Sequence, residues 1–459
     1  MRERHFLAVS LLLLAASFTS PTLAQGPGDG GSAVAAVSLL PSQAVQERLD
    51  GLFYDWNTFQ LDLAAAERAV RKTGHVQLEL GGRLFDLELQ PNDVRAPGYV
   101  EIHHTRRGQV RARSSAVATF KGIVAGEPDS VVRLLILPDL LQGYIKSGEE
   151  WLFIDPLTKY AKGQSTSHIV VFDERDLRPE AAGLCGVGEL SRLAAESAIE
   201  PTSSVGDSIR VVTADATFRR VDLATEADYE YFSIYGVNAN SQIQGVVNQV
   251  DGIYRPELSV NLRIVFQSVW MVSGDPYTSS NHDTLTGQFR DYWNTHRGDV
   301  ARDTAHLFTG RDLDGNTVGA AWRAVLCNNP SLSYGISQNT GLMAKLVAHE
   351  IGHNLSAEHD NQVSPPASTC DGFGTIMCSS IQSFGPNSFS QRSKNDISSH
   401  VANHGGCLEK VLIEPPASSN GPAFFEHYFG WGNLGQCGYD TQGLLYGSQG
   451  VEAGTWTMP

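Results

Sequence analysis

Residues 349–360 read HEIGHNLSAEHD, and this stretch decides the fold of the region around it. His349 and His353 lie four residues apart, so on a helix their side chains point to the same side, one turn apart. Glu350 follows about 100° further round the helix axis than His349. The apolar pattern before the first histidine predicts a helix from about Thr340 to Leu355.

A metal site can be built from these side chains. Two imidazoles on one helix face can bind one zinc ion, and a catalytic zinc site needs three protein ligands and an open position. His359 supplies the third ligand if the helix ends near Leu355 or Ser356 and the chain turns back. Glu350 can then reach a water near the metal rather than the metal itself, which is the place of a general base.

Two other interpretations of the histidines are weaker. An ordinary polar helix face would have to acquire the spacing of all three histidines by chance, at odds on the order of one in a thousand. A zinc site kept only for structure is usually closed by four protein ligands, whereas this stretch has three and a well-placed glutamate. The spacing therefore favours a catalytic zinc site.

The length and charge of the chain limit the other function classes. The chain has 459 residues, enough for two or three domains, and 41% of them are hydrophobic, as is typical of a globular protein. The 34 basic and 50 acidic residues give a net charge of −16. Phosphate contacts need a basic face, so this balance argues against nucleic acid as a partner.

Residues 1–24 are expected to be a signal peptide. Arg2 and Arg4 precede an apolar run from Phe6 to Phe18, and Thr22-Leu23-Ala24 offers small residues before a cut. The alternative, a membrane anchor, is disfavoured because the run is shorter than the ~20 residues that span a bilayer. We therefore expect a protein secreted to the extracellular space, with no membrane partner.

Residues 75–160 have the alternating pattern of β-strands, after a stretch at about 45–72 that predicts a helix. Gly81-Gly82 separates two alternating runs and predicts a hairpin turn. The apolar residues of the two runs are Val76, Leu78 and Leu80, and then Phe85, Leu87 and Leu89.

A second organisation begins near residue 208, where SIRVVTAD predicts a buried strand. Strand patterns alternate with helical ones from there to about Cys407, which predicts an α/β domain with a mixed sheet. One predicted helix has its apolar residues at Ile243, Val246, Val247, Val250 and Tyr254. Residues 411–459 read as a linker and a short C-terminal segment of unknown role.

The chain resembles the reprolysin (adamalysin, ADAM-type) zinc metalloendopeptidases of the metzincin clan. HEIGHNL followed by HD matches that family's zinc-binding motif. Residues 306–337 resemble the family's substrate-side edge strand and the segment that leads to the zinc helix. The TIM sequence ending at Met377 matches the Met-turn. Residues 75–157 resemble the family's propeptide, so the resemblance covers roughly residues 75–410.

The resemblance implies a metzincin catalytic domain over 207–410, with a mixed twisted sheet and a zinc-binding helix, preceded by a β-rich prodomain within 25–200. It implies one zinc ion and protein or peptide substrates. Met377 is then a structural floor beneath the metal. The strand Gly319-Ala320-Ala321 is expected to pair with the substrate backbone.

The six cysteines are expected to be disulfide-bonded by default in an exported protein. The resemblance implies a Cys327–Cys407 bridge, and Cys370 and Cys378 are close enough to pair and clamp the Met-turn loop. The pairing of the remaining two cysteines, Cys185 and Cys437, is left open, and Cys437 has no assigned partner.

Cys185 lies in LCGVG, just ahead of the catalytic domain, and resembles the cysteine switch of metzincin propeptides. Its sulfur is expected to occupy the fourth zinc position in the zymogen and block it, because thiolate is a strong zinc ligand. The alternative is a disulfide from Cys185 to Cys437, which needs two distant segments to meet within ~7 Å.

Several positions depart from the family. Ser356 stands where members usually have glycine, just after the helix, where a left-handed conformation costs a non-glycine residue about 1 kcal/mol. Arg392 stands where a cysteine is common, so one family disulfide is absent.

Calcium binding is left open by the sequence. Arg210 stands where many members have a calcium-binding glutamate. Asp312, Asp314 and Asn316 suggest a calcium loop, but they lack the full EF-hand pattern and more often form a plain turn.

The sequence as a whole predicts a secreted zymogen of a zinc endopeptidase, with Glu350 as the base and His349, His353 and His359 as the zinc ligands. The alternative is a catalytically weak metzincin-fold binding or adhesion protein. The natural substrate, the side-chain specificity and the oligomeric state are not predicted.

Overall fold

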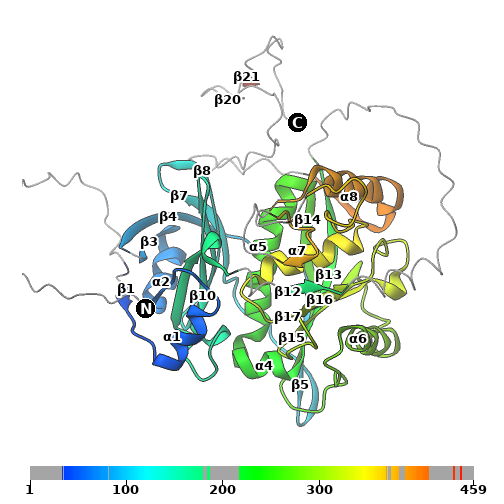
Figure 1. Ribbon diagram of the computed structural model, residues 1–459, viewed down its shortest axis with the longest axis horizontal. Helices are drawn as coiled ribbons and strands as arrows, with labels where there is room; N and C mark the ends of the chain where they lie inside the picture. The colour runs from blue at the N-terminus through cyan, green and yellow to red at the C-terminus, as the bar shows by residue number, and fades with distance from the viewer. Residues whose placement is uncertain are drawn as a thin grey trace, which may run out of the picture.

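The computed structural model describes residues 34, 36–80, 82–178, 183–186, 217–368, 370, 374–381 and 388–412, with short strands at 438–439 and 445–446. In these residues the strands form a nine-stranded sheet, a ten-stranded sheet and a two-stranded pair, β20 (Gly438–Tyr439) with β21 (Leu445–Tyr446). Residues 36–186 are called the N-terminal segment below, and residues 217–412 the C-terminal domain. The two parts lie side by side in Figure 1.

The nine-stranded sheet is antiparallel and comes entirely from the N-terminal segment. One face is covered by α2 (Leu63–Thr73), whose apolar side chains share a core with the strands. A shorter helix, α1 (Gln43–Asp50), packs into a second cluster of apolar side chains. In spatial order the strands are β1 (Ala36–Ser38), β2 (Asn57–Leu61), β11 (His168–Asp173), β10 (Glu150–Pro156), β9 (Leu140–Ser147), β8 (Glu127–Leu137), β7 (Thr119–Val124), β4 (Arg83–Pro91) and β3 (His75–Leu80).

The predicted hairpin is confirmed, because β3 and β4 pair antiparallel and Val76, Leu78 and Leu80 are all buried. The helical pattern predicted over about 45–72 is confirmed in part, as the two helices α1 and α2. It is split by β2, whose Phe59 and Leu61 are buried against the sheet. A strand paired on both sides satisfies its backbone there, and this tertiary pairing overrides local helix propensity.

The C-terminal domain has a mixed sheet with helices packed against it, which confirms the predicted α/β class. Its central strand β13 is parallel to β14 and β15, β15 is parallel to β17, and β16 is antiparallel to β17. The strands are β13 (Thr217–Ala227), β14 (Val260–Trp270), β15 (Thr304–Thr309), β16 (Thr317–Ala321), β17 (Tyr334–Gln338), β18 (Ser380–Ile381) and β19 (Glu409–Leu412). The helices are α4 (Tyr229–Tyr235), α5 (Ala239–Leu258), α6 (His282–His296), α7 (Met343–Asn354) and α8 (Gln391–His404).

Helix α5 crosses the middle of the molecule and has the apolar stripe that the sequence predicted. The side chains of Ile243, Val246, Val247, Val250 and Tyr254 are completely buried. They share one core with apolar residues of α7, including Val347 and Ile351. This packing fixes the position of α7, the helix that carries the histidines.

Three strands of the N-terminal segment lie in the C-terminal domain's sheet, a placement that the sequence does not predict. β5 (Arg95–Thr105) pairs parallel with β14, and β6 (Gly108–Arg111) pairs with β5. β12 (Gly183–Cys185) lies between β16 and β18 at the other end of the sheet. The N-terminal segment therefore contributes strands to both ends of the sheet in the C-terminal domain.

The strand predicted at 208–215 lies outside the described residues, and so does Arg210. The first described strand of the domain, β13, begins at Thr217. Its two consecutive arginines interrupt the apolar alternation by which a strand is predicted from sequence. Arg220 forms ion pairs with Asp222 and Glu409, so its charge is compensated at the sheet.

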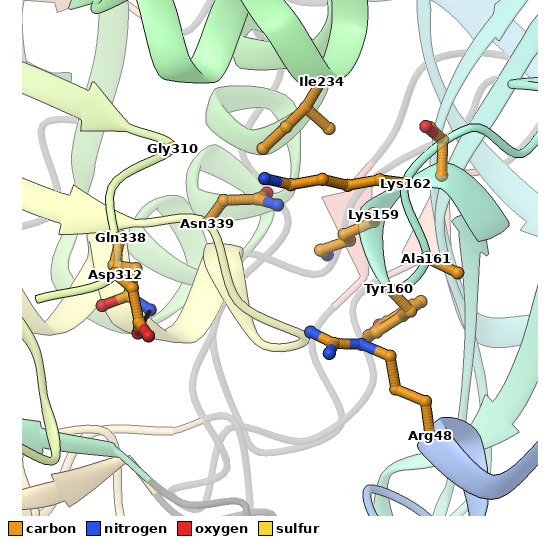
Figure 2. Close-up of a pocket in the computed structure, with 11 residues that line it drawn as sticks. Arg48, Lys159, Tyr160, Ala161, Lys162, Ile234, Gly310, Asp312, Gln338 and Asn339 are labelled. Carbon is orange, nitrogen blue, oxygen red and sulfur yellow. Dashed lines mark hydrogen bonds between the residues drawn. The ribbon is translucent and has the colours of Figure 1, made fainter. Parts of the chain in front are cut away.

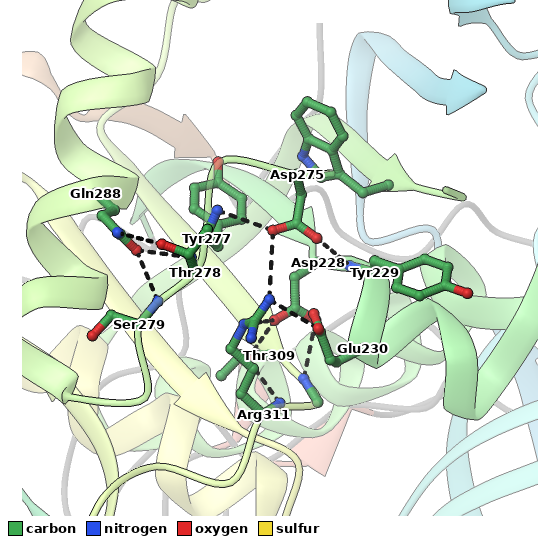
Figure 3. A network of polar contacts seen from close by, with 12 residues as sticks. Asp228, Tyr229, Glu230, Asp275, Tyr277, Thr278, Ser279, Gln288, Thr309 and Arg311 are labelled. Atoms are coloured by element: carbon green, nitrogen blue, oxygen red, sulfur yellow. Dashed lines mark hydrogen bonds and ion pairs between the residues drawn. The ribbon is translucent and has the colours of Figure 1, made fainter. Parts of the chain in front are cut away.

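A polar network ties α4 to the loop after β15 (Figure 3). Asp228 caps α4 by accepting from the Tyr231 amide at 2.7 Å, and it also accepts from the Gly310 amide at 3.1 Å. Arg311 lies 2.8 Å from the carboxylate of Glu230. The carboxylates in this network therefore have partners within the fold and hold the loop in place.

In the part of the chain that the structure describes, no helix is both long enough and apolar enough to cross a bilayer.

Candidate metal centre

Helix α7 places two of the three predicted ligands. Every residue from Met343 to Asn354 is buried, so the helix runs through the interior rather than along the surface. His349 and His353 face the same side, and their Nε2 atoms are 2.9 Å apart. The i, i+4 spacing of the sequence therefore brings the two imidazole rings together as predicted.

The chain turns back after α7 and brings the third histidine to the other two. Ser356 adopts the left-handed conformation with φ of 85°, as its place after the helix predicted. The turn is closed by the Ala357 amide, which donates to the Gly352 carbonyl at 3.0 Å. His359 Nε2 then lies 3.3 Å from His349 Nε2 and 3.2 Å from His353 Nε2.

The other ring nitrogens of the histidines are held by oxygen atoms. His349 Nδ1 donates to the Ile376 carbonyl at 2.6 Å, and His353 Nδ1 donates to the Ala357 carbonyl at 2.8 Å. His359 Nδ1 is 2.8 Å from Gln362 Oε1. Because these oxygens only accept, each Nδ1 carries the proton and each Nε2 presents a lone pair.

Three lone pairs that face one another repel, and a cation at their centre removes the repulsion. Atoms about 2.1 Å from one zinc ion in a tetrahedral arrangement lie about 3.4 Å apart, close to the separations of the three Nε2 atoms. Burial lowers the pKa of His349 to about 3 and that of His353 well below its usual range. The rings therefore stay neutral, as metal ligands must, and the donor set fits zinc.

Glu350 is fully buried beside the histidines. Its Oε2 accepts from the Cys185 thiol at 3.5 Å, while its Oε1 has no hydrogen-bond partner among the described residues. Burial raises the pKa of this carboxyl to about 8. A side chain at Gly319 would come within 2.5 Å of Glu350 Oε1, so this glycine makes room for the carboxylate.

The structure brings Cys185 to the histidines. Its Sγ lies 3.6 Å from His353 Nε2, and the sulfur and three histidine nitrogens all lie within 4.8 Å of one another. The Cys185 amide donates to the Ser379 carbonyl at 3.0 Å, and the Gly186 amide donates to the Gly319 carbonyl at 3.0 Å. A side chain at Gly186 would come within 2.3 Å of the His282 ring, which would have to shift to make room for it.

The predicted substrate-binding strand lies at the same place. Gly319 of β16 is paired with Cys185 of β12, which runs parallel to β16. Ala320 and Ala321 are completely buried and pair with Ile336 and Gly335 of the next strand. In the described part of the chain, β12 thus occupies the edge of β16 that faces away from β17.

Met377 packs against α7. Its side chain is completely buried, and its sulfur is 2.7 Å from where a side chain at Gly352 would begin. The neighbouring carbonyl of Ile376 is the one that orients His349. Met377 therefore supports the helix between the two histidines.

Asp360 has a structural role that its place in the sequence does not predict. Its Oδ1 accepts from Ser390 Oγ at 2.6 Å and from Ser393 Oγ at 2.8 Å, and Thr375 binds its other oxygen. It thereby ties the residue after His359 to the start of α8. The only signal in the sequence was its place directly after the third histidine.

Both predicted disulfides are present, Cys327–Cys407 and Cys370–Cys378. Cys185 is in neither of them, and Cys437, its alternative partner, lies outside the described residues.

Two other features lie away from the histidines. Residues 315–316 form a turn after a bend at Asp314, with Gly315 at a φ of 70°, and Asp312 accepts from the Gln338 side chain. A cavity of about 490 Å³ separates Lys159 and Lys162 of the N-terminal segment from Asn339 of the C-terminal domain (Figure 2). None of the histidines or Glu350 lines it, so it is separate from the metal centre.

Residues 217–390 match the family model described as Metallo-peptidase family M12 (Reprolysin_5). This match confirms the resemblance to reprolysins and supports a zinc-dependent hydrolase acting on protein or peptide substrates. It does not favour the alternative of a binding or adhesion protein. Among solved structures, the crystal structure of metalloproteinase-II from Bacteroides fragilis matches at 14% identity and a TM-score of 0.43, over 78% of this chain and 94% of that chain.

Proposed function

We propose that this chain, a family M12 metallopeptidase over residues 217–390, is a zinc endopeptidase secreted as an inactive zymogen. One observation carries the proposal. Three neutral Nε2 lone pairs converge next to a buried carboxylate, within a segment that matches a peptidase family. Such an arrangement costs stability unless a cation binds there, and that cost is expected at functional sites.

His349, His353 and His359 would hold the zinc ion. When bound, zinc would supply Lewis-acid chemistry, polarising the scissile carbonyl and lowering the pKa of a nearby water.

Glu350 acts as the general base in this proposal. Its carboxylate takes a proton from the attacking water and passes it to the nitrogen of the leaving amine. Burial raises the pKa of this carboxyl to about 8, so the side chain takes up a proton more readily than an exposed glutamate does. The unpartnered Oε1 is the atom available to accept the proton, next to the edge of β16 where substrate backbone would pair.

In the zymogen, Cys185 would fill the fourth ligand position on zinc. Its sulfur already contacts both His353 and Glu350, and β12 covers the edge of β16. Loss of the thiol frees the ligand position but leaves β12 paired with β16. Full-length Cys185→Ser should therefore hydrolyse a protein substrate such as casein before any cleavage of its own chain, faster than the inert parent and more slowly than the same variant once its N-terminal segment is separated. A variant as inert as the parent would show that the thiol is not the block.

The role of Glu350 is tested in the Cys185→Ser background. Adding Glu350→Gln should lower the hydrolysis rate by about 10²–10⁴-fold and leave one zinc ion per chain, measured by elemental analysis. Glu358→Gln is the matched control, because Glu358 lies in the turn that follows α7, and its side chain is 39% exposed and paired with Arg323. Full activity in the Glu350→Gln variant would rule out this mechanism, and loss of zinc would make the glutamate a ligand.

A further inference from the structure

The sheet of the C-terminal domain is covered at both ends by strands of the N-terminal segment, and the two coverings differ in extent. β5 lies along β14, with pairs running from Arg95 opposite Ile264 to His104 opposite Trp270 (Figure 1). β12 has three residues. The longer contact lies far along the sheet from the histidines.

Side chains of β5 make specific contacts with the C-terminal domain. The Tyr99 hydroxyl donates to Gln267 Oε1 at 2.7 Å, and Glu101 accepts from Asn240 Nδ2 at 2.9 Å. The ring of His104 stacks on Trp270 with centroids 3.6 Å apart. Without β5, the polar groups in these contacts would have to form their hydrogen bonds with water instead.

Apolar side chains of β5 add to this contact. Val100 and Ile102 pack against a buried aromatic cluster of the C-terminal domain that includes Phe266 and Trp293. Without β5, these aromatic groups and the backbone edge of β14 would be exposed to water, which costs free energy on both counts.

A second contact surface lies between α5 and the nine-stranded sheet. Asn248 Nδ2 donates to the Phe120 carbonyl at 2.9 Å, and Asn248 Oδ1 accepts from Asn92 Nδ2 at 2.7 Å. A side chain at Gly245 would come within 3.0 Å of Leu135, so the helix and the sheet approach closely. The N-terminal segment is therefore held on a face of α5 as well as at the edge of β14.

The third contact is a buried ion pair. Lys345 of α7 lies 3.4 Å from Glu174 of the N-terminal segment, and both side chains are at least 96% buried. β12 follows Glu174 in the chain by nine residues. The strand β12, which pairs with β16 beside the histidines, is thus covalently joined to a body that three other contacts hold in place.

We propose that the edge of β14 is a lasting binding site for residues 95–105, so that the N-terminal segment stays bound after the chain is cut within 187–216. The cut piece then carries β12 with it and keeps Cys185 in the cleft. Cleavage of the connection is a necessary step but does not by itself open the site. Activation needs a second event that separates β12 from the anchored body or removes the body.

The binding part of this proposal is independent of catalysis, and the latency part rests on the proposed function. The test replaces residues 191–200 of the full chain with the recognition sequence of a site-specific protease, in a Glu350→Gln background that prevents self-cleavage. After the cut, size-exclusion chromatography at about 1 μM protein should show both pieces eluting together. Separate elution of the two pieces would overturn the proposal.

The edge of β14 is tested by a matched pair of substitutions on the hairpin. Ile102→Asp places a carboxylate against the aromatic cluster and should speed dissociation of the cut pieces by about tenfold or more. Val110→Asp makes the same change where the side chain is 48% exposed and should have no effect. If Ile102→Asp impairs folding, Tyr99→Phe removes the hydroxyl contact alone and should speed dissociation by a smaller factor. Dissociation unchanged from the parent in each folded variant would overturn the role of this edge.

Latency is measured with Glu350 restored. The cut protein should remain as inactive as the uncut one while its pieces co-elute, and the cut Ile102→Asp protein should become active as its pieces separate. Full activity in a cut protein whose pieces still co-elute would overturn the retention of β12. Failure of the proposed function gives a different result, because then Cys185→Ser is also inactive while the pieces still co-elute.

Discussion

Two glutamates of the C-terminal domain are completely buried, Glu226 and Glu350, and their surroundings differ in one respect. Glu226 accepts three hydrogen bonds, from Trp270 Nε1 at 2.6 Å, the Tyr277 hydroxyl at 2.7 Å and Trp293 Nε1 at 2.9 Å. Burial raises the pKa of this carboxyl, and the three donors pull it down. Its charge is therefore compensated within the fold.

Glu350 accepts fewer hydrogen bonds than Glu226 does. A thiol at 3.5 Å is the donor to Oε2, and Oε1 has no partner in the described part of the chain. A buried polar atom without a partner costs about 1–3 kcal/mol, so an unpartnered carboxylate persists where an incoming group uses it. The comparison separates a buried carboxylate that supports the fold from one that retains the capacity to act on a substrate.

The largest expected difference between the two glutamates is in stability. Glu226→Ala leaves three buried donors without an acceptor and should lower the free energy of unfolding by about 4 kcal/mol. Glu350→Ala removes a carboxylate that has few donors and should lower it by less than about 1 kcal/mol. Urea unfolding of the two variants in zinc-free buffer measures both values.

Equal losses in the two variants would contradict the comparison. Zinc content is the second readout, because the folded fraction of Glu226→Ala should still bind one zinc ion. Loss of zinc from that fraction would mean that the two regions are coupled.

The sequence predicted the metal centre better than it predicted the support around it. The spacing of His349, His353 and His359 is a local constraint, and the turn at Ser356 follows from it. The roles of Glu226 and Asp360 depend on donors contributed by distant elements, which no local pattern records.

The same distinction holds for the fold. The β3–β4 hairpin and the helix α5 were predictable, because alternation and 3.6-residue periodicity are properties of a short window. The placement of β5 and β12 in the sheet of the C-terminal domain was not, because their own alternation does not say which sheet they join. A strand pattern predicts that a segment forms a strand, but the tertiary fold decides which strand it pairs with.

A third buried glutamate gives an intermediate case. Glu174 has a charged partner, Lys345, at 3.4 Å, yet burial outweighs that attraction and raises the pKa of its carboxyl to about 7. The folded protein then holds a proton that the unfolded chain releases between about pH 4.5 and 7. The stability that this group contributes is fully present below pH 4.5 and is lost as the pH rises through 7.

Replacing this carboxyl should therefore flatten the pH profile. Between pH 5 and 8 the parent is expected to lose on the order of 1–3 kcal/mol more than Glu174→Gln does. Glu150→Gln, which removes a surface ion pair with Arg83, is the control and should shift stability by less than about 1 kcal/mol. Thermal unfolding across this pH range measures the profiles, and parallel curves for the parent and Glu174→Gln would contradict the raised pKa.

The smallest expected effect concerns the backbone that brings His359 back to the metal centre. Ser356 holds a φ of 85°, which costs a residue with a side chain about 1 kcal/mol. Glycine removes that cost but loses more freedom on folding, so Ser356→Gly should raise the free energy of unfolding by less than about 1 kcal/mol. Ser259→Gly is the control, since Ser259 has a φ of 52° at the end of α5, away from the histidines. Zinc affinity should be unchanged in both variants if the conformation at Ser356 serves only the turn. A gain in stability with weaker zinc binding in Ser356→Gly alone would instead show that the serine helps to hold His359 in place. The strained backbone at Ser356 would then be, like the unpartnered carboxylate of Glu350, a feature that costs stability and serves function.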